Sequence, residues 1–86
     1  MEIENLDLHN NVEYMLDLTT ARIVHKIRNK MEQQNVLPEE LARQIKKSKR
    51  YVVKLLDERV SLSIKNLIKI SIALNCELEV DIKRQD

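Results

Sequence analysis

The side chains best suited to binding chemistry are concentrated in Lys46–Arg50, a run that contains four bases around Ser48. Ser48 is a suitable N-cap for a helix that begins at residue 49, because its hydroxyl can accept from backbone N–H groups two or three residues later. Lys49 and Arg50 then fall in the first turn, where the positive end of the helix dipole disfavours cations by roughly 0.3–1 kcal/mol each. A sequence selected for stability alone would place Asp or Glu there. The run therefore predicts a site for an anionic partner, and we favour nucleic acid over a merely solvated surface.

Patterns typical of catalysis and metal binding are absent from the sequence. His9, His25 and Cys76 are the only histidines and cysteine, and their spacing is not that of a metal site. The chain has no glycine for a phosphate-binding loop, and Glu39–Glu40 is explained by a favourable interaction with a helix N-terminus. A single cysteine also excludes an internal disulfide and fits a reducing compartment. We expect no enzyme, no metal and no cofactor.

Two short amphipathic helices joined by a tight turn must position the basic run. Apolar residues recur at helical spacing on both sides of it: Leu41, Ala42 and Ile45 before, and Val52, Leu55 and Leu56 after. We expect the first helix to begin at Pro38 and the second to extend from Lys49 to Asp57. The apolar residues of the second helix would face a core. Its outward positions are then Lys49, Arg50, Val53 and Lys54.

The stretch LARQIKKSKRYVVKLL (41–56), followed by Leu62-Ser63-Ile64 and LIKISIALNCELEV (67–80), resembles a known family. It is similar to the helix-turn-helix family of phage repressors, Cro proteins and bacterial XRE-type regulators, above all to small members that end in a β-strand, some of which are antitoxins. The resemblance implies a mainly α fold, a phage-repressor-like helix-turn-helix bundle of four to five helices with a C-terminal β-strand. This sequence departs from the family at Leu37, where a capping Ser or Thr is usual, and at Lys46, where Gly is usual.

The resemblance makes the helix 49–57 a recognition helix in the major groove of double-stranded DNA. There Arg or Lys can bind guanine O6 and N7, and a valine methyl can touch the thymine methyl. We expect base contacts from the outward positions of this helix: Lys49, Arg50, Val53 and Lys54. Phosphate contacts are expected from side chains around them: Arg43, Lys46, Lys47, Ser48 and Lys65.

The rest of the chain divides into an N-terminal arm, one domain and a C-terminal strand. Residues 1–10 are acidic and show no clear period, so we expect an arm outside the domain. Residues 11–75 form the helix-turn-helix DNA-binding domain, whose first helix covers residues 11–34. Whether that helix breaks near residues 17–20 is left open by the pattern. Residues 76–83 alternate apolar and polar side chains with period two, which predicts a half-buried strand, and residues 84–86 form a tail.

A lone strand needs a partner, because its backbone groups and its apolar face would otherwise be uncovered. That face consists of Leu78, Val80 and Ile82. We favour antiparallel pairing with the same strand of a second copy, which would give a homodimer. The alternatives are pairing with residues 2–8 of the same chain and strand addition by a toxin protein.

The whole chain of 86 residues has a net charge of +1, but its charges are segregated. Residues 1–18 carry five acids and no base, whereas residues 43–54 carry six bases and no acid. Only two aromatic residues are present, which argues against stacking on single strands. No signal peptide or membrane span is evident, so we expect a cytoplasmic protein. The leading hypothesis is a transcriptional repressor or autoregulator, and the alternative is an antitoxin or a protein-interaction module.

Overall fold

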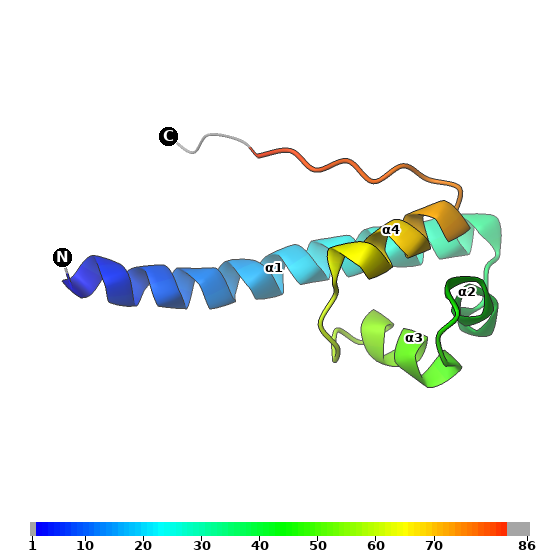
Figure 1. The fold of residues 1–86 in the computed structure, drawn as a ribbon, viewed down its shortest axis with the longest axis horizontal. Helices are drawn as coiled ribbons and strands as arrows, with labels where there is room; N and C mark the ends of the chain where they lie inside the picture. Colours follow the sequence, from blue (N-terminus) through cyan, green and yellow to red (C-terminus); the bar gives the residue numbers. More distant parts are fainter. Residues whose placement is uncertain (1, 83–86) are drawn as a thin grey trace.

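The computed structural model describes residues 2–82 of the chain, with side chains from residue 11 onward. Its four helices are α1 (Glu2–Gln34), α2 (Pro38–Ile45), α3 (Lys49–Leu56) and α4 (Ile64–Ala73). Helix α1 is a long rod, and the three short helices gather beside its C-terminal half (Figure 1). The N-terminal half of α1 projects beyond them. The mainly helical fold predicted from the sequence is confirmed.

Helix α1 is continuous, which answers the question that the sequence left open. No break occurs at residues 17–20, and the helix begins at Glu2 rather than near residue 11. The structure therefore places residues 2–10 in α1, whereas we had predicted an arm outside the helix. The sequence 2–34 contains no Pro or Gly. Once a helix is nucleated, each further residue adds a backbone hydrogen bond, so a segment without helix breakers can extend it.

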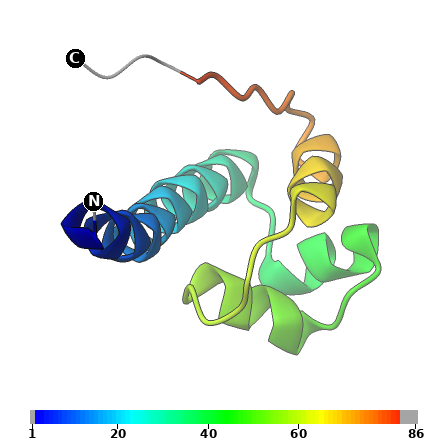
Figure 2. The ribbon, with the colours of Figure 1, turned by 60° about the vertical axis from the view of Figure 1, so that its left-hand side comes forward.

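The core lies where the three short helices meet the C-terminal half of α1 (Figure 2). Every helix contributes apolar side chains to it, and no polar side chain of the described residues is buried. Its buried members are Val24, Ile27, Met31, Leu41, Ala42, Ile45, Val52, Leu55, Leu56, Ile70 and Leu74. Residues widely separated in the sequence thus hold α3 against the other helices.

The helix ends follow from the residue types at them. Ser63 Oγ accepts from Asn66 N at 3.1 Å and so caps α4. Asn35 and Asn75 have φ of 56°, the left-handed conformation that asparagine tolerates better than most residues. Leu37 provides no side-chain cap for α2, as its type predicts, but its backbone N–H donates to Glu40 Oε1 at 3.1 Å.

The predicted C-terminal strand is not formed. Residues 76–82 have no regular secondary structure, and no strand is present anywhere in residues 2–82. A strand is defined by hydrogen bonds to a second strand, and nothing in this part of the chain supplies one. Val80 and Ile82 are 78% and 94% exposed, whereas Leu78 is half-buried. Residue 83 of the predicted strand and the tail 84–86 lie outside the described residues.

The segment 76–82 leaves the end of α4 and extends back alongside α1 (Figure 1). It forms one wall of a groove whose other walls are α1 and α4. No helix within residues 2–82 is both long and apolar enough to cross a membrane.

Candidate nucleic-acid interface

A tight turn sets the position of α3 relative to α2. Lys46 has φ 60° and ψ 45°, and the N–H of Lys47 donates to Ala42 O at 2.9 Å. Lys46 therefore adopts the left-handed conformation of the usual glycine. Ser48 then caps α3, because its Oγ accepts from Tyr51 N at 3.0 Å. The Ser48 cap was predicted from its residue type, whereas Lys46 was noted only as a departure from the usual glycine of the family.

Helix α3 has one buried face and one free face. Val52, Leu55 and Leu56 are buried in the core, as predicted. Lys49, Arg50 and Val53 are exposed, and Lys54 is half-buried. The helix ends at Leu56, one residue before the predicted end, and Asp57 is its C-cap. The four side chains expected to contact bases thus all lie outside the core.

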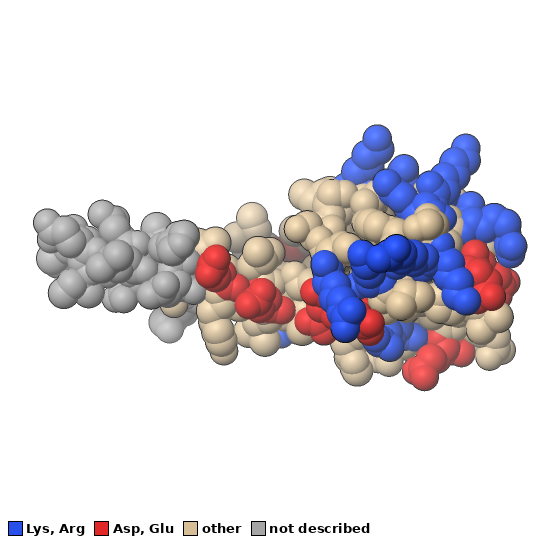
Figure 3. Space-filling view, turned by 90° about the horizontal axis from the view of Figure 1, so that it is seen from below, with Lys and Arg blue, Asp and Glu red and all other residues tan. Residues whose placement is uncertain are grey.

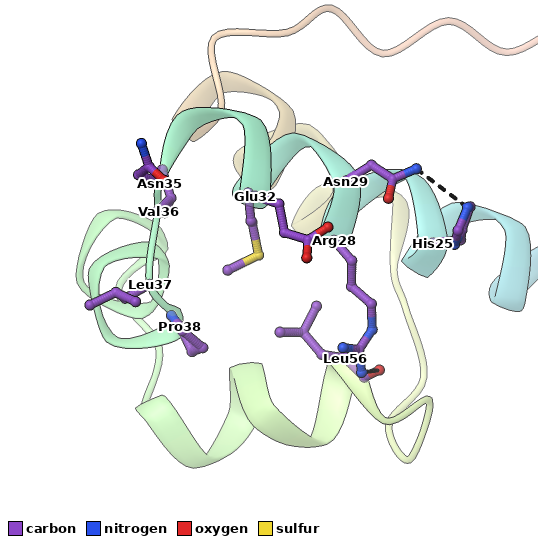
Figure 4. Close-up of a pocket in the computed structure, with 10 residues that line it drawn as sticks. His25, Arg28, Asn29, Glu32, Asn35, Val36, Leu37, Pro38 and Leu56 are labelled. Atoms are coloured by element: carbon purple, nitrogen blue, oxygen red, sulfur yellow. Dashed lines mark hydrogen bonds between the residues drawn. The ribbon is translucent and has the colours of Figure 1, made fainter.

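Arg28 of α1 holds the C-terminal end of α3. Its guanidinium donates to the carbonyl oxygen of Leu56 and lies 3.6 Å from Asp57 Oδ1. Figure 4 shows the side chain extending from α1 toward Leu56. A cation at a helix C-terminus is favoured by the helix dipole. Sequence reasoning did not find this contact, because the partners are 28 residues apart and no local pattern joins them.

Tyr51 connects α3 to α4 and lies beside a candidate phosphate ligand. Its hydroxyl accepts from Asn66 Nδ2 at 2.7 Å. The Lys47 ammonium is 5.4 Å from the centroid of the Tyr51 ring, within the range of a cation–π interaction. Sequence reasoning missed this role of Tyr51. The four-residue spacing from Lys47 was the only local signal, and the bond to Asn66 depends on how the helices pack.

The basic side chains predicted to contact phosphate surround the free face of α3. Arg43, Lys46, Lys47 and Lys65 are all exposed, as is Ser48. Lys65 lies in the first turn of α4, next to the Asn66 that binds Tyr51. Figure 3 views the molecule from the side of α3. It shows Lys and Arg side chains gathered at the end of the molecule that carries the short helices. An anionic surface could therefore meet bases from three helices and the turn.

The hollow shown in Figure 4 is the other feature near α3. It is lined by residues of α1, of the turn between α1 and α2, and by Leu56. His25 and Asn29 are hydrogen-bonded to each other across 3.3 Å on α1. Within the described residues, no group of three or more His, Cys, Asp or Glu side chains is close enough to hold a metal ion. Among the side chains that line this hollow, Arg28 is the one that is hydrogen-bonded to the end of α3.

A capped helix that presents bases outward, set on a second helix by a left-handed turn, defines a helix-turn-helix domain. A family model described as Helix-turn-helix matches residues 27–80, more than half of the chain. The chain belongs to this family, of the XRE and phage-repressor type, whose domains bind DNA. Comparisons with curated proteins and with solved structures found no match.

Proposed function

We propose that the protein is a sequence-specific transcriptional regulator, a repressor or autoregulator, that inserts α3 into the major groove of double-stranded DNA. The observation that carries the proposal is the division of α3 into a buried apolar face and a free face with Lys49, Arg50, Val53 and Lys54. Arg50 and the lysines can donate to guanine edges, and Val53 can contact a thymine methyl. Cations in the first turn interact unfavourably with the positive end of the helix dipole. A bound anion would interact favourably with that end of the helix and with the cations.

The surrounding bases support a backbone-binding role. Arg43, Lys46, Lys47 and Lys65 are exposed around α3, and Ser48 lies at its N-terminus, where free backbone N–H groups favour a phosphate. Such contacts fix the register of the protein on DNA without reading its sequence. Specific binding requires both kinds of contact: base contacts from the helix and phosphate contacts from the residues around it.

The proposal is tested by alanine substitution of two free side chains of α3. Arg50→Ala and Lys54→Ala should each weaken binding to the preferred site by about 1–3 kcal/mol and relax the preference at one base pair. Fluorescence anisotropy with the DNA upstream of the protein's own gene measures this loss. The matched control is Lys30→Ala, an exposed base on α1 that lines the groove beside residues 76–81. Unchanged affinity in both α3 variants would show that this helix does not read DNA.

We propose further that the C-terminal segment forms its strand by antiparallel pairing with a second copy. Val80 and Ile82 are 78% and 94% exposed in the single chain, and the alternation of residues 76–82 provides one apolar face. Pairing would satisfy the free backbone groups and cover that face. A homodimer would also present two recognition helices, which specific affinity generally needs in a module of this size.

Sedimentation of the full chain and of Val80→Pro tests this pairing, because proline removes a backbone donor. We expect the wild type to sediment as a dimer and the proline variant to dissociate more readily. A proline variant that dimerises as well as the wild type would exclude strand pairing. A wild type that remains monomeric until a toxin protein is added would instead favour strand addition by that protein, the function of an antitoxin.

A further inference from the structure

Helix α1 carries an apolar stripe that starts in its projecting half and reaches the edge of the core at Ile23. Val12, Leu16, Thr19 and Ile23 are separated by four, three and four residues, the spacing of a coiled-coil seam. Val12 and Leu16 are 56% and 62% exposed. At 3.6 residues per turn, the stripe lies roughly a quarter turn around α1 from the buried Val24, Ile27 and Met31.

The stripe continues into the groove beside the C-terminal segment, where Ile23 is half-buried against the core while Val12 and Leu16 stay exposed. Thr19 and Ile23 line this groove together with Val80 and Asp81. The C-terminal segment is close enough to serve as a cover, yet the side chains of Val80 and Ile82 remain exposed. The apolar surfaces of α1 and of the C-terminal segment therefore lie side by side, both open to a further chain.

The charges of α1 restrict which further helix can pack on this stripe. Residues 1–18 contain five acids and no base, whereas residues 19–31 contain four bases and no acid. Parallel pairing of two α1 helices would set acids against acids and bases against bases. Antiparallel pairing sets the acidic half of each helix against the basic half of the other. The same chain therefore supplies the complementary partner in the antiparallel orientation only.

We propose that two copies of this chain pack antiparallel along α1, with the two-fold axis between Asp17 and Leu18. Val12 then faces the partner's Ile23, and Leu16 faces the partner's Thr19, so the stripe is self-complementary in this register. Val80 and Asp81 lie in the groove beside Thr19 and Ile23, so the two C-terminal segments meet near the same axis. The α1 pair is a second contact within the same dimer as the proposed strand pairing, so loss of either contact weakens the dimer, and it does not depend on DNA binding.

Sedimentation of the full-length protein tests the α1 interface. Leu16→Glu should raise the dissociation constant of the dimer at least tenfold, because it places a carboxylate in the apolar seam. The matched control is Ile72→Glu, which changes an isoleucine of α4 that is 71% exposed and should leave the dimer intact. Circular dichroism verifies that both variants remain folded. A monomeric wild type at tens of micromolar, an intact Leu16→Glu dimer, or a dimer dissociated equally by Ile72→Glu would each overturn the proposal.

Disulfide trapping tests the orientation, in a Cys76→Ser background so that no native thiol competes. A mixture of the Val12→Cys and Ile23→Cys proteins, one carrying a longer tag, should form the mixed disulfide dimer. The Val12→Cys protein alone should not crosslink, because eleven residues of helix separate the two thiols by about 16 Å and a disulfide needs Cα atoms within about 7 Å. Efficient crosslinking of Val12→Cys with itself, without the mixed species, would show parallel pairing and overturn the proposal.

Discussion

Lys46 serves two purposes that can be separated by substitution. Its left-handed conformation disfavours any side chain with a Cβ, whereas its exposed ammonium is a candidate phosphate ligand. Lys46→Ala and Lys46→Gly both remove the charge, so both should weaken binding to all sequences and reduce the salt slope by about one unit. Only Lys46→Gly also relieves the backbone, so it should be about 1 kcal/mol more stable than Lys46→Ala. Urea denaturation and salt-dependent anisotropy measure the two effects. Equal stability of the two variants would contradict a left-handed Lys46 in solution.

The residues that sequence analysis placed correctly are those governed by near neighbours. The hydroxyl of Ser48, predicted as an N-cap, accepts from the backbone N–H group three residues later. Arg28 and Tyr51 were missed because their partners are reached only after the helices have packed. Local chemistry can be read from residue types, whereas the supports of α3 depend on the tertiary structure.

At the scale of elements, α2 packs against both α3 and α4 and so ties α3 into the core. Its Leu41 is fully buried at 0% exposure. Leu41→Ala should lower the free energy of unfolding by about 2–5 kcal/mol, because it removes buried contacts and leaves a cavity. Leu37→Ala, at a leucine that is 56% exposed, should change it by less than about 0.5 kcal/mol. Urea denaturation followed by circular dichroism compares the two. Equal losses would contradict the packing of α2.

The elements differ in how well their sequence patterns predicted them. The start of α2 and both ends of α3 were predicted to within a residue, because apolar periodicity, Pro38 and the Ser48 cap all agree. The start of α1 was predicted near residue 11, whereas the helix begins at Glu2, because the sequence of residues 2–10 shows no apolar period that marks a helix start. The strand was predicted from alternation alone, which indicates a face to be covered but not the strand that covers it.

At the scale of the whole molecule, charge segregation and fold point to the same arrangement. The six bases of residues 43–54 lie in the α2–α3 region, whereas the five acids of residues 1–18 lie on α1. DNA would attract the first region and repel the second. Under the proposed function, this asymmetry would orient the domain with α3 toward the duplex and leave α1 for the proposed assembly. The pairing proposed for α1 was not predicted from the sequence, because it depends on a second chain whose position no local pattern gives.

Selection of bound sequences from a random double-stranded DNA library tests most directly whether α3 reads sequence. For the wild type, we expect one enriched motif with two inverted half-sites about 10 base pairs apart, centre to centre. In the same experiment, Arg50→Ala should lose its preference at one position of each half-site while the rest of the motif persists. Lack of any enriched motif with the folded wild type, or an identical motif with Arg50→Ala, would contradict the account.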